Sequence, residues 1–436
     1  MAGGALSLKV KSTGLSGQNR NAKNAKDRPL QRGANATVRK WPLSGSGDWR
    51  QNIWGSRLEG MTRTIEDLIP DYLRGLPVYV PGKPIEEVER ELKIHAVKLA
   101  SNENPLGPSP KGIAAAKAVL ADSNRYPDGG THALREALAE RHGVSPDEIF
   151  IGLGSSELID LAARVLLRAG LQGLTSEGTY APFSVAIRAS GAELVLAQQR
   201  EFAFDLRGMA KAITPTTGVI YLANPNNPTG SAFGREEFYE CLAAVPDGVL
   251  VVLDEAYIHY ALSMGLRDSV EAYRKRKNLL ILRTFSKVYG LAGLRIGYAI
   301  GRPELLSAMN KLRTPFNTSG VAQAAALAAL DDKEHVTRCI DTNAAERKRL
   351  SDGLAKLGFQ PVPSEANFVF IVVGPEAKAL SDDLLQMGVI VRPLGWMGFP
   401  EAIRISVGTA EENDKCLSAM TQVISRRAGK SELAAR

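Results

Sequence analysis

The feature that most constrains the fold is a series of short apolar runs, each followed directly by polar residues. Val219–Ala223, Val249–Leu253 and Leu279–Leu282 contain four or five consecutive apolar residues. Runs of this length suit strands buried on both faces, and they are far shorter than the roughly 20 apolar residues of a membrane-spanning helix. Helical patterns separate the runs. The sequence therefore predicts an α/β fold in which helices cover both faces of a largely parallel sheet.

Two further strands and three helices extend this pattern. Glu148–Gly152 and Leu294–Ile300 are predicted strands, and a helix is expected over Glu157–Arg168. In that helix, apolar residues recur at the spacing of one helical face. Upstream, short helices are predicted at Ile65–Arg74 and Pro84–Glu91, on either side of a stretch rich in Pro and Gly. These two helices precede the sheet and belong to an N-terminal arm.

The pattern changes after about residue 332, where a long polar helix is predicted over Lys333–Leu357. Strands are expected at Phe368–Val373, Val389–Arg392 and Ala402–Val407, and a last helix follows them. Because a chain of 436 residues exceeds the size of an ordinary single core, this α+β segment indicates a second, smaller domain. The expected divisions are a basic disordered tail at 1–60, an N-terminal arm at 61–100, a large domain at 101–332, a small domain at 333–428 and a disordered tail at 429–436.

The positive charge of the chain is concentrated in its first 60 residues. They hold eleven Lys and Arg against three acids, a net charge of +8, which leaves about −1 of the total +7 for residues 61–436. A nucleic-acid-binding protein needs a basic face on a folded element, so this distribution argues against that class. We expect a dispensable disordered tail, with an organelle transit peptide or a start at Met61 as the alternatives.

Cysteine and histidine are sparse in this chain. Cys241, Cys339 and Cys416 are far apart and odd in number, and the five histidines show no metal-ligand spacing. Neither a disulfide framework nor a metal site is expected, and a reducing compartment such as the cytoplasm is favoured. The hydrophobic share of 44% and the charged share of 23% are typical of a soluble globular protein.

Polar segments follow the apolar runs where the predicted strands end. Asn224–Gly230, Asp254–Tyr257 and Thr284–Lys287 follow the three central runs, and Gly152–Ser156 joins another strand to its helix. In an open α/β sheet, ligands bind at the carboxyl ends of the strands. Glycine beside a helix N-terminus also favours an anion, although the same residues make ordinary turns. We therefore predict a ligand site shared by these four segments.

In order and spacing, these segments resemble the signature segments of fold-type-I pyridoxal-phosphate aminotransferases of class I and II. The resemblance implies a large domain with a mostly parallel seven-stranded sheet covered by helices, and a small C-terminal α+β domain. It also implies an enzyme that holds pyridoxal 5'-phosphate on Lys287 and transfers amino groups. Three such segments, each just past a strand, are far more specific together than any one alone.

Lys287 and Asp254 fit the chemistry of this cofactor. A lysine amine condenses with the cofactor aldehyde, and it must be partly desolvated to act as a nucleophile and later as a base. Lys287 lies in otherwise uncharged sequence, and a solvated surface lysine is the alternative. Asp254 follows an all-apolar run, where an acid is costly unless it meets a cation such as the protonated ring nitrogen. A turn or helix cap is the alternative for Asp254.

The resemblance assigns further contacts with the cofactor. Asn227 and Tyr257 hydrogen-bond the ring oxygen, and Tyr180 stacks on the ring, with a plain core tyrosine as its alternative. The residues that the resemblance places at the cofactor phosphate are Ser155, Ser156, Ser286 and Arg295.

Two N-terminal segments narrow the resemblance to the histidinol-phosphate aminotransferase subfamily. They are Ser101–Pro105 and Asn124–Gly130, and both also suit simple turns because they are dense in Asn, Pro and Gly. In that subfamily the tyrosine at the Tyr126 position reaches the cofactor phosphate of the neighbouring subunit. A homodimer with shared sites follows from this resemblance.

Three substrate-binding positions follow from the same resemblance, namely Asn104, Arg392 and Arg404. Arginine suits this task because its planar guanidinium pairs with two oxygens at once. Arg404 lies between apolar residues of a predicted strand, whereas an exposed arginine is the stronger alternative for Arg392.

The resemblance implies amino exchange between L-histidinol phosphate and 2-oxoglutarate, giving imidazole acetol phosphate and L-glutamate. Leu106 stands where the family often has an aromatic residue. Trp396 stands where a smaller pattern is usual and would enlarge an aromatic-binding wall, so an aromatic amino acid aminotransferase is the nearest alternative. A pyridoxal-phosphate lyase such as a threonine-phosphate decarboxylase would keep Lys287, Asp254 and Arg295. A non-catalytic binding protein would be expected to lose Lys287 or Asp254. Small molecules are therefore the expected partners, with no nucleic acid and no membrane.

Overall fold

The structure is a computed structural model, and it describes residues 64–76, 83–261 and 269–434, with side chains as far as Arg427. Except for Thr64, these residues belong to one compact unit, and the predicted basic tail at 1–60 lies outside the described residues. Within the described ranges, no helix has the length and apolar character needed to cross a membrane. The same ranges contain no cluster of His, Cys, Asp and Glu that could hold a metal ion.

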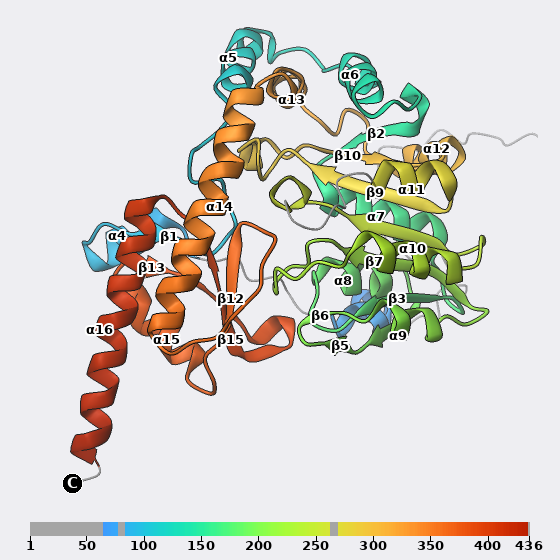
Figure 1. Cartoon of the computed structure of the whole chain (residues 1–436). Helices are drawn as coiled ribbons and strands as arrows, with labels where there is room; N and C mark the ends of the chain where they lie inside the picture. Colours follow the sequence, from blue (N-terminus) through green and yellow to red (C-terminus); the bar gives the residue numbers. More distant parts are fainter. Residues whose placement is uncertain (1–63, 77–82, 262–268, 435–436) are drawn as a thin grey trace, which may run out of the picture. The chain divides into compact units, whose positions relative to one another are not determined.

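The larger sheet has seven strands in the order β2-β10-β9-β8-β7-β3-β4 (Figure 1). Six strands are mutually parallel, and β10 runs antiparallel to its neighbours β2 and β9. The mostly parallel seven-stranded sheet implied by the resemblance is therefore confirmed. The strands are β2 (Ile149–Gly152), β3 (Gln172–Ser176), β4 (Glu193–Ala197), β7 (Thr217–Ala223), β8 (Leu250–Asp254), β9 (Leu279–Thr284) and β10 (Gly297–Ile300).

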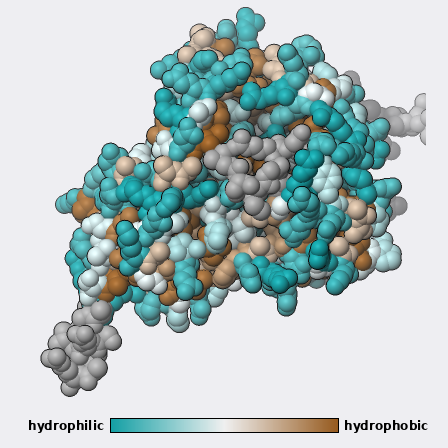
Figure 2. Space-filling view, viewed as in Figure 1, coloured by the Kyte–Doolittle hydropathy of each residue, from teal (hydrophilic) through white to brown (hydrophobic). Residues whose placement is uncertain are grey.

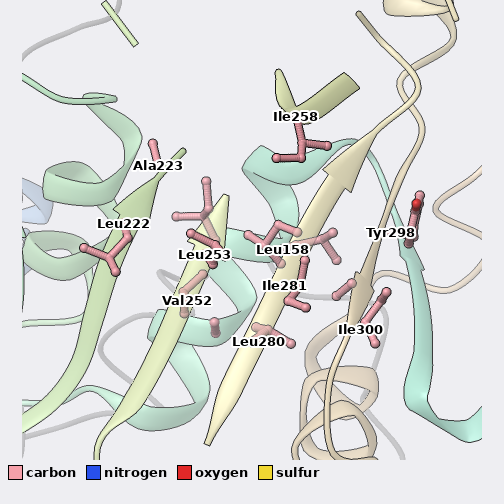
Figure 3. Close-up of a cluster of buried hydrophobic side chains, with 14 of the residues drawn as sticks. Leu158, Leu222, Ala223, Val252, Leu253, Ile258, Leu280, Ile281, Tyr298 and Ile300 are labelled. Carbon is pink, nitrogen blue, oxygen red and sulfur yellow. The ribbon is translucent and has the colours of Figure 1, made fainter. Parts of the chain in front are cut away.

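Helices pack around this sheet and form one apolar core with it. Those of this part of the chain are α5 (Pro110–Val119), α6 (His132–His142), α7 (Ser155–Leu166), α8 (Pro182–Ala189), α9 (Leu206–Lys211), α10 (Arg235–Ala244), α11 (Ser269–Lys275), α12 (Pro303–Leu312) and α13 (Gly320–Leu330). Figure 3 shows Leu158 of α7 among the side chains of β7, β8, β9 and β10. Leu158 is fully buried, and burial of such a side chain stabilises the fold by roughly 2 kcal/mol. This packing fixes α7 against the sheet, with its N-terminus at the carboxyl end of β2.

A second, antiparallel sheet has the strand order β11-β12-β15-β14. Its strands are β11 (Pro361–Val362), β12 (Phe368–Val372), β14 (Arg392–Leu394) and β15 (Phe399–Ser406). The helices α14 (Lys333–Lys356), α15 (Ala377–Gln386) and α16 (Ala410–Ala434) enclose a separate apolar core with it. This agrees with an α+β unit after residue 332, and the division of the chain into two domains stays a prediction. The backbone of α16 is helical as far as Ala434, so most of the predicted tail at 429–436 is helix.

Two predicted elements differ from the structure. The predicted strand Val389–Arg392 is wrong as a single element, because β13 (Val389–Ile390) pairs in parallel with β1 (Val97–Lys98) whereas Arg392 already belongs to β14. The predicted helix Ile65–Arg74 is likewise two short helices, α2 (Ile65–Leu68) and α3 (Asp71–Arg74). Pro70 separates them, since proline cannot donate a hydrogen bond to the preceding turn and disfavours helix in the residue before it.

The remaining elements are short. The predicted helix Pro84–Glu91 is confirmed as α4 (Ile85–Leu92), with Pro84 as its N-cap residue. The predicted strand Leu294–Ile300 begins only at Gly297 in β10, because Arg295 takes a left-handed backbone conformation (φ 53°) that interrupts an extended strand. A small hairpin, β5 (Gln199–Arg200) with β6 (Ala203–Phe204), lies between β4 and α9.

Candidate active site

A cavity of about 270 Å³ opens at the carboxyl ends of β7, β8 and β9. Ala223, Asp254 and Thr284, the last residues of these three strands, all line it. Eleven of the thirteen predicted site residues line the same cavity, although they come from distant parts of the chain. They are Ser155, Ser156, Tyr180, Asn227, Asp254, Tyr257, Ser286, Lys287, Arg295, Arg392 and Arg404.

Asp254 is a buried acid at the end of an apolar strand. Burial raises the pKa of its carboxyl group to about 7, although the Ala256 amide (3.0 Å) and the Ser155 hydroxyl donate hydrogen bonds to it. A carboxylate in this position is stabilised most by a cationic group placed against it. The site is therefore suited to a ligand that presents a protonated nitrogen to Asp254.

Lys287 reaches the cavity from the segment that follows β9. Its Nζ donates to the carbonyl oxygens of Asn102 (3.2 Å) and Ser101 (3.5 Å). Burial, and then the positive charge of Arg404, lower the pKa of the Lys287 amine to about 8. A larger fraction of this amine is thus neutral near pH 7 than for a solvated lysine, which is the form needed for attack on a carbonyl.

An anion site forms at one end of the cavity, at the N-terminus of α7. Ser155 and Ser156 begin this helix, directly after Gly154, whose φ of 80° is available without strain only to glycine. The guanidinium of Arg295 donates to the Leu153 carbonyl (3.2 Å) and to the Ser286 hydroxyl (3.4 Å). A helix N-terminus, serine hydroxyls and a guanidinium together favour a phosphate group.

Three polar side chains line the walls between these groups. The Tyr180 hydroxyl lies 3.0 Å from the Ser156 hydroxyl, so the phenol ring of Tyr180 is held at the anion site. The Tyr257 hydroxyl accepts a hydrogen bond from the Asn102 amide (2.9 Å). The amide oxygen of Asn227 accepts one from Arg404 (2.5 Å).

The two arginines of the second sheet form another cationic region of the cavity. Arg392 on β14 and Arg404 on β15 are directly paired across the two strands, and both side chains are largely buried. Like charges placed opposite each other in a sheet repel, so this arrangement favours an anion between or beside them. The Arg392 guanidinium also lies 4.9 Å from the centre of the Trp396 ring, a cation–π contact that orients it.

Two predicted site residues lie outside the cavity lining. The Asn104 amide donates to the Val288 carbonyl (2.9 Å) and contacts the Cys339 sulfur (3.1 Å), which ties the N-terminal segment to the segment after Lys287. Tyr126 is 82% exposed and stacks on Phe316, with ring centres 4.7 Å apart. Neither residue reaches the site within this one chain.

Sequence reasoning gave no role to several residues that line the cavity, among them Ser101, Asn102 and Thr284. Asn102 and Ser101 were noted only as part of a turn-rich segment, and Thr284 only as the start of the lysine segment. The side chain of Asn102 is buried, and its amide contacts Tyr257. No local signal separates such an asparagine from one in an ordinary turn, because its partners lie far away in the sequence.

Comparisons with known proteins agree with this geometry. Residues 94–420 match the family model for aminotransferase class I and II. The chain is 46% identical over 360 residues to histidinol-phosphate aminotransferase from Anaeromyxobacter sp., covering 82% of this chain and 99% of that protein. It is 45% identical over 352 residues to histidinol-phosphate aminotransferase 2 from Pseudomonas aeruginosa, covering 80% of this chain and 95% of that protein.

A solved structure extends the agreement to three dimensions. The crystal structure of histidinol-phosphate aminotransferase from Sinorhizobium meliloti in complex with pyridoxal-5'-phosphate superimposes with a TM-score of 0.76 at 33% sequence identity. The match covers 82% of this chain and 98% of that one. Together with the matched family model, these relatives show that the chain belongs to the class I and II aminotransferases, in the histidinol-phosphate aminotransferase subfamily.

Proposed function

We propose that the chain is a pyridoxal-phosphate-dependent transaminase that exchanges an amino group between L-histidinol phosphate and 2-oxoglutarate. The observation that carries this proposal is the single cavity in which Lys287, Asp254 and the anion site at α7 meet. The related proteins from Anaeromyxobacter sp. and Pseudomonas aeruginosa, both named for histidinol phosphate, support the choice of substrate.

The residues present fit this cofactor. Asp254 is a buried acid whose pKa is raised by burial, and a protonated pyridine nitrogen placed against it would favour its charged form. Ser155, Ser156, Ser286 and Arg295 suit its phosphate, and Lys287 suits its aldehyde. When bound, the cofactor draws electrons away from the substrate Cα and so makes the Cα proton acidic. Asn227 and Tyr257 are then the contacts that we assign to its ring oxygen, and Tyr180 to its ring face.

Lys287 is the residue that we assign to proton transfer. Its amine is partly desolvated, with a pKa lowered to about 8, so Nζ can accept a proton near neutral pH and return it. In each half of the exchange, Nζ would carry the proton between the substrate Cα and the cofactor carbon. The surrounding wall of Tyr257, Arg404 and the Asn102 carbonyl limits the positions from which the amine can act.

Arg392 and Arg404 are the groups that we assign to substrate anions. Histidinol phosphate carries a phosphate ester and no α-carboxylate, whereas glutamate carries carboxylates, so one pocket must accept both kinds of anion. Two paired guanidinium groups can do so, because the planar fork of N–H donors matches the oxygens of both carboxylate and phosphate groups. Asn104 stays a predicted substrate contact, although its amide faces Val288 in this structure.

The alternatives find less support. The alternative of an aromatic amino acid aminotransferase is based on Trp396, which lines the cavity next to Arg392. The two relatives are named for histidinol phosphate and not for an aromatic amino acid. A lyase would need no 2-oxoglutarate.

The exposed Tyr126 with its stacked partner Phe316 supports a homodimer in which Tyr126 reaches the neighbouring site. A cytoplasmic location is part of the same proposal, since three cysteines are free and buried.

Single-turnover absorbance spectroscopy tests the proposed function. Purified enzyme with bound cofactor is mixed in turn with histidinol phosphate, glutamate and phenylalanine, and conversion of the cofactor from its aldehyde to its amine form is followed. Fast conversion with the first two and slow conversion with phenylalanine is expected. A preference for phenylalanine would indicate an aromatic aminotransferase, and no conversion with any amine would indicate a lyase.

A further inference from the structure

Asn102 occupies a position that joins three parts of the molecule. Its side chain is buried, and its backbone is left-handed with a φ of 55°. Asparagine is among the few residues that tolerate this conformation. The residue contacts Tyr257 beyond β8, Ser406 at the end of β15 and Lys287 beyond β9.

Hydrogen bonds with Ser406 fix which end of the Asn102 amide faces Tyr257. The backbone N–H of Asn102 donates to the Ser406 hydroxyl oxygen (2.8 Å), and that hydroxyl donates its own hydrogen to Oδ1 of Asn102 (3.0 Å). The hydroxyl oxygen accepts the first bond and its single hydrogen makes the second, so both contacts are satisfied with Oδ1 facing Ser406. Nδ2 of Asn102 is thereby directed at the Tyr257 hydroxyl, 2.9 Å away.

The direction of this hydrogen bond constrains the tyrosine. An amide nitrogen can only donate, so the Tyr257 oxygen accepts from Asn102 and its hydrogen points elsewhere. Tyr257 lines the cavity, where we have assigned it to the ring oxygen of the cofactor. We propose that Asn102 is a positioning residue that directs the Tyr257 hydroxyl hydrogen towards that ring oxygen.

This role connects the second sheet to the cofactor. Ser406 and Arg404 lie two residues apart on β15, on the same face of the strand, and Arg404 donates to the Ala100 carbonyl (2.7 Å) in the segment that holds Asn102. The Asn102 carbonyl accepts from both Asn367 (3.1 Å) and Lys287 (3.2 Å). The residue that we assign to the substrate anion, Arg404, is therefore two positions along β15 from Ser406, whose hydroxyl orients Asn102.

The effect is measured without substrate, by titrating the absorbance of the cofactor attached to Lys287. A hydrogen bond donated to the ring oxygen withdraws negative charge from it. Without that bond, the ring oxygen stays more negative beside the lysine nitrogen and holds the lysine-linked proton to higher pH. We expect Asn102→Gly, which keeps the left-handed backbone but removes the amide, to raise the titration midpoint by about one pH unit.

A double-mutant cycle identifies the route of the effect. Tyr257→Phe alone is expected to raise the midpoint in the same direction, and Asn102→Gly is expected to add nothing further in the Tyr257→Phe background. Equal shifts in both backgrounds would mean that Asn102 acts independently of Tyr257 and would overturn the proposal. An unchanged midpoint in Asn102→Gly would overturn it as well.

Two further variants separate positioning from loosening of the fold. Asn343→Ala removes another buried asparagine amide, whose hydrogen bond goes to the Ala366 carbonyl (3.3 Å) and not to the Tyr257 hydroxyl. Its midpoint is expected to stay unchanged even if its stability falls. Asn102→Asp, which tolerates the same backbone, replaces the donor with an acceptor and should raise the midpoint more than Asn102→Gly does, because it turns the hydroxyl hydrogen away from the cavity and adds a negative charge.

This inference rests on the cofactor site of the proposed function, and the two can fail separately. If no cofactor attaches to Lys287 in the unaltered enzyme, the proposed function fails. If the cofactor attaches and titrates but Asn102→Gly has no effect, only the role of Asn102 fails.

Discussion

Lys287 and Asp254 lie in the same cavity, and burial shifts the pKa of each side chain in the direction that favours its neutral form. The pKa of the lysine amine falls to about 8, and that of the aspartate carboxyl rises to about 7. Each group is therefore partly neutral near pH 7 in the protein without cofactor. A protonated pyridine placed against Asp254 reverses this for the acid, because a nearby cation favours its charged form.

The pH dependence of cofactor attachment follows from the lowered pKa of Lys287. Only the neutral amine attacks an aldehyde, and the neutral fraction grows as the pH rises through the pKa. We expect the rate of attachment to cofactor-free protein to increase with pH, with a midpoint near the lysine pKa of about 8. Stopped-flow absorbance measures this rate. A midpoint close to the value of about 10.4 for a solvated lysine would contradict the buried environment.

Replacement of Lys287 tests the assignment of both attachment and proton transfer. We expect Lys287→Ala to lose covalent attachment and to reduce turnover by roughly 100-fold or more. Borohydride reduction followed by mass spectrometry of the peptides detects attachment. Lys277→Ala is the matched control, because the Lys277 amine pairs with Glu148 (2.8 Å) at the surface and should not affect either measurement. Normal turnover in Lys287→Ala would refute the proposed function.

At the scale of elements, the strands that form the site were the easiest to predict. β7, β8 and β9 are buried on both faces, so their apolar runs are continuous, and each run is followed within a few residues by polar residues that line the cavity. The partners of other strands could not be predicted. β13 separates from β14 because Val389 pairs with Val97, nearly 300 residues earlier, and no local pattern encodes that pairing.

The junction between β2 and α7 is an element whose shape affects the site directly. A Cβ added at Gly154 would lie 2.9 Å from Nη2 of Arg295, and the φ of 80° there is unfavourable for any side chain. We expect Gly154→Ala to displace the guanidinium and to weaken cofactor binding by roughly tenfold, since alanine in this backbone conformation, which is almost confined to glycine, costs about 1–3 kcal/mol. Equilibrium titration with pyridoxal phosphate measures the affinity.

Gly234→Ala is the control for this change. Gly234 also precedes a helix, α10, but its φ is −78° and no atom lies within 4 Å of an added Cβ. Its affinity for the cofactor should stay unchanged. If both variants bind the cofactor as tightly as the unaltered enzyme, the anion site does not depend on the shape of the β2–α7 junction.

At the scale of the whole molecule, the residues that act together are joined by folding and not by sequence. The sequence segments that resemble the family contain eleven of the residues that the structure brings together in one cavity. The contact between Asn102 and Ser406 spans 304 positions, so no local pattern could indicate it. Tyr126 is predicted to act in a neighbouring subunit.

The basic N-terminal segment gives a prediction at this scale. The 360 residues aligned with the relative from Anaeromyxobacter sp. span 99% of that protein, so the parts needed for catalysis are expected to lie within them. We expect a variant lacking residues 1–60 to keep its turnover and cofactor affinity. Steady-state kinetics and cofactor titration of the two forms, purified in parallel, test this. Loss of cofactor binding on deletion would show that the segment contributes to the folded enzyme.

The antiparallel direction of β10 has a mechanical consequence for the cofactor site. β10 runs antiparallel to β9, and Gly297 pairs with Thr284. The loop that carries Lys287 and Arg295 therefore leaves the sheet and returns to it at the same end of these two strands. Phe285 and Ile296 close its base with a backbone hydrogen bond (3.1 Å). Lys287 and Arg295 thus belong to one loop, and both ends of this loop are anchored in the sheet. If this loop moves, Lys287 and Arg295 move together, and the spacing between these two cofactor contacts is preserved.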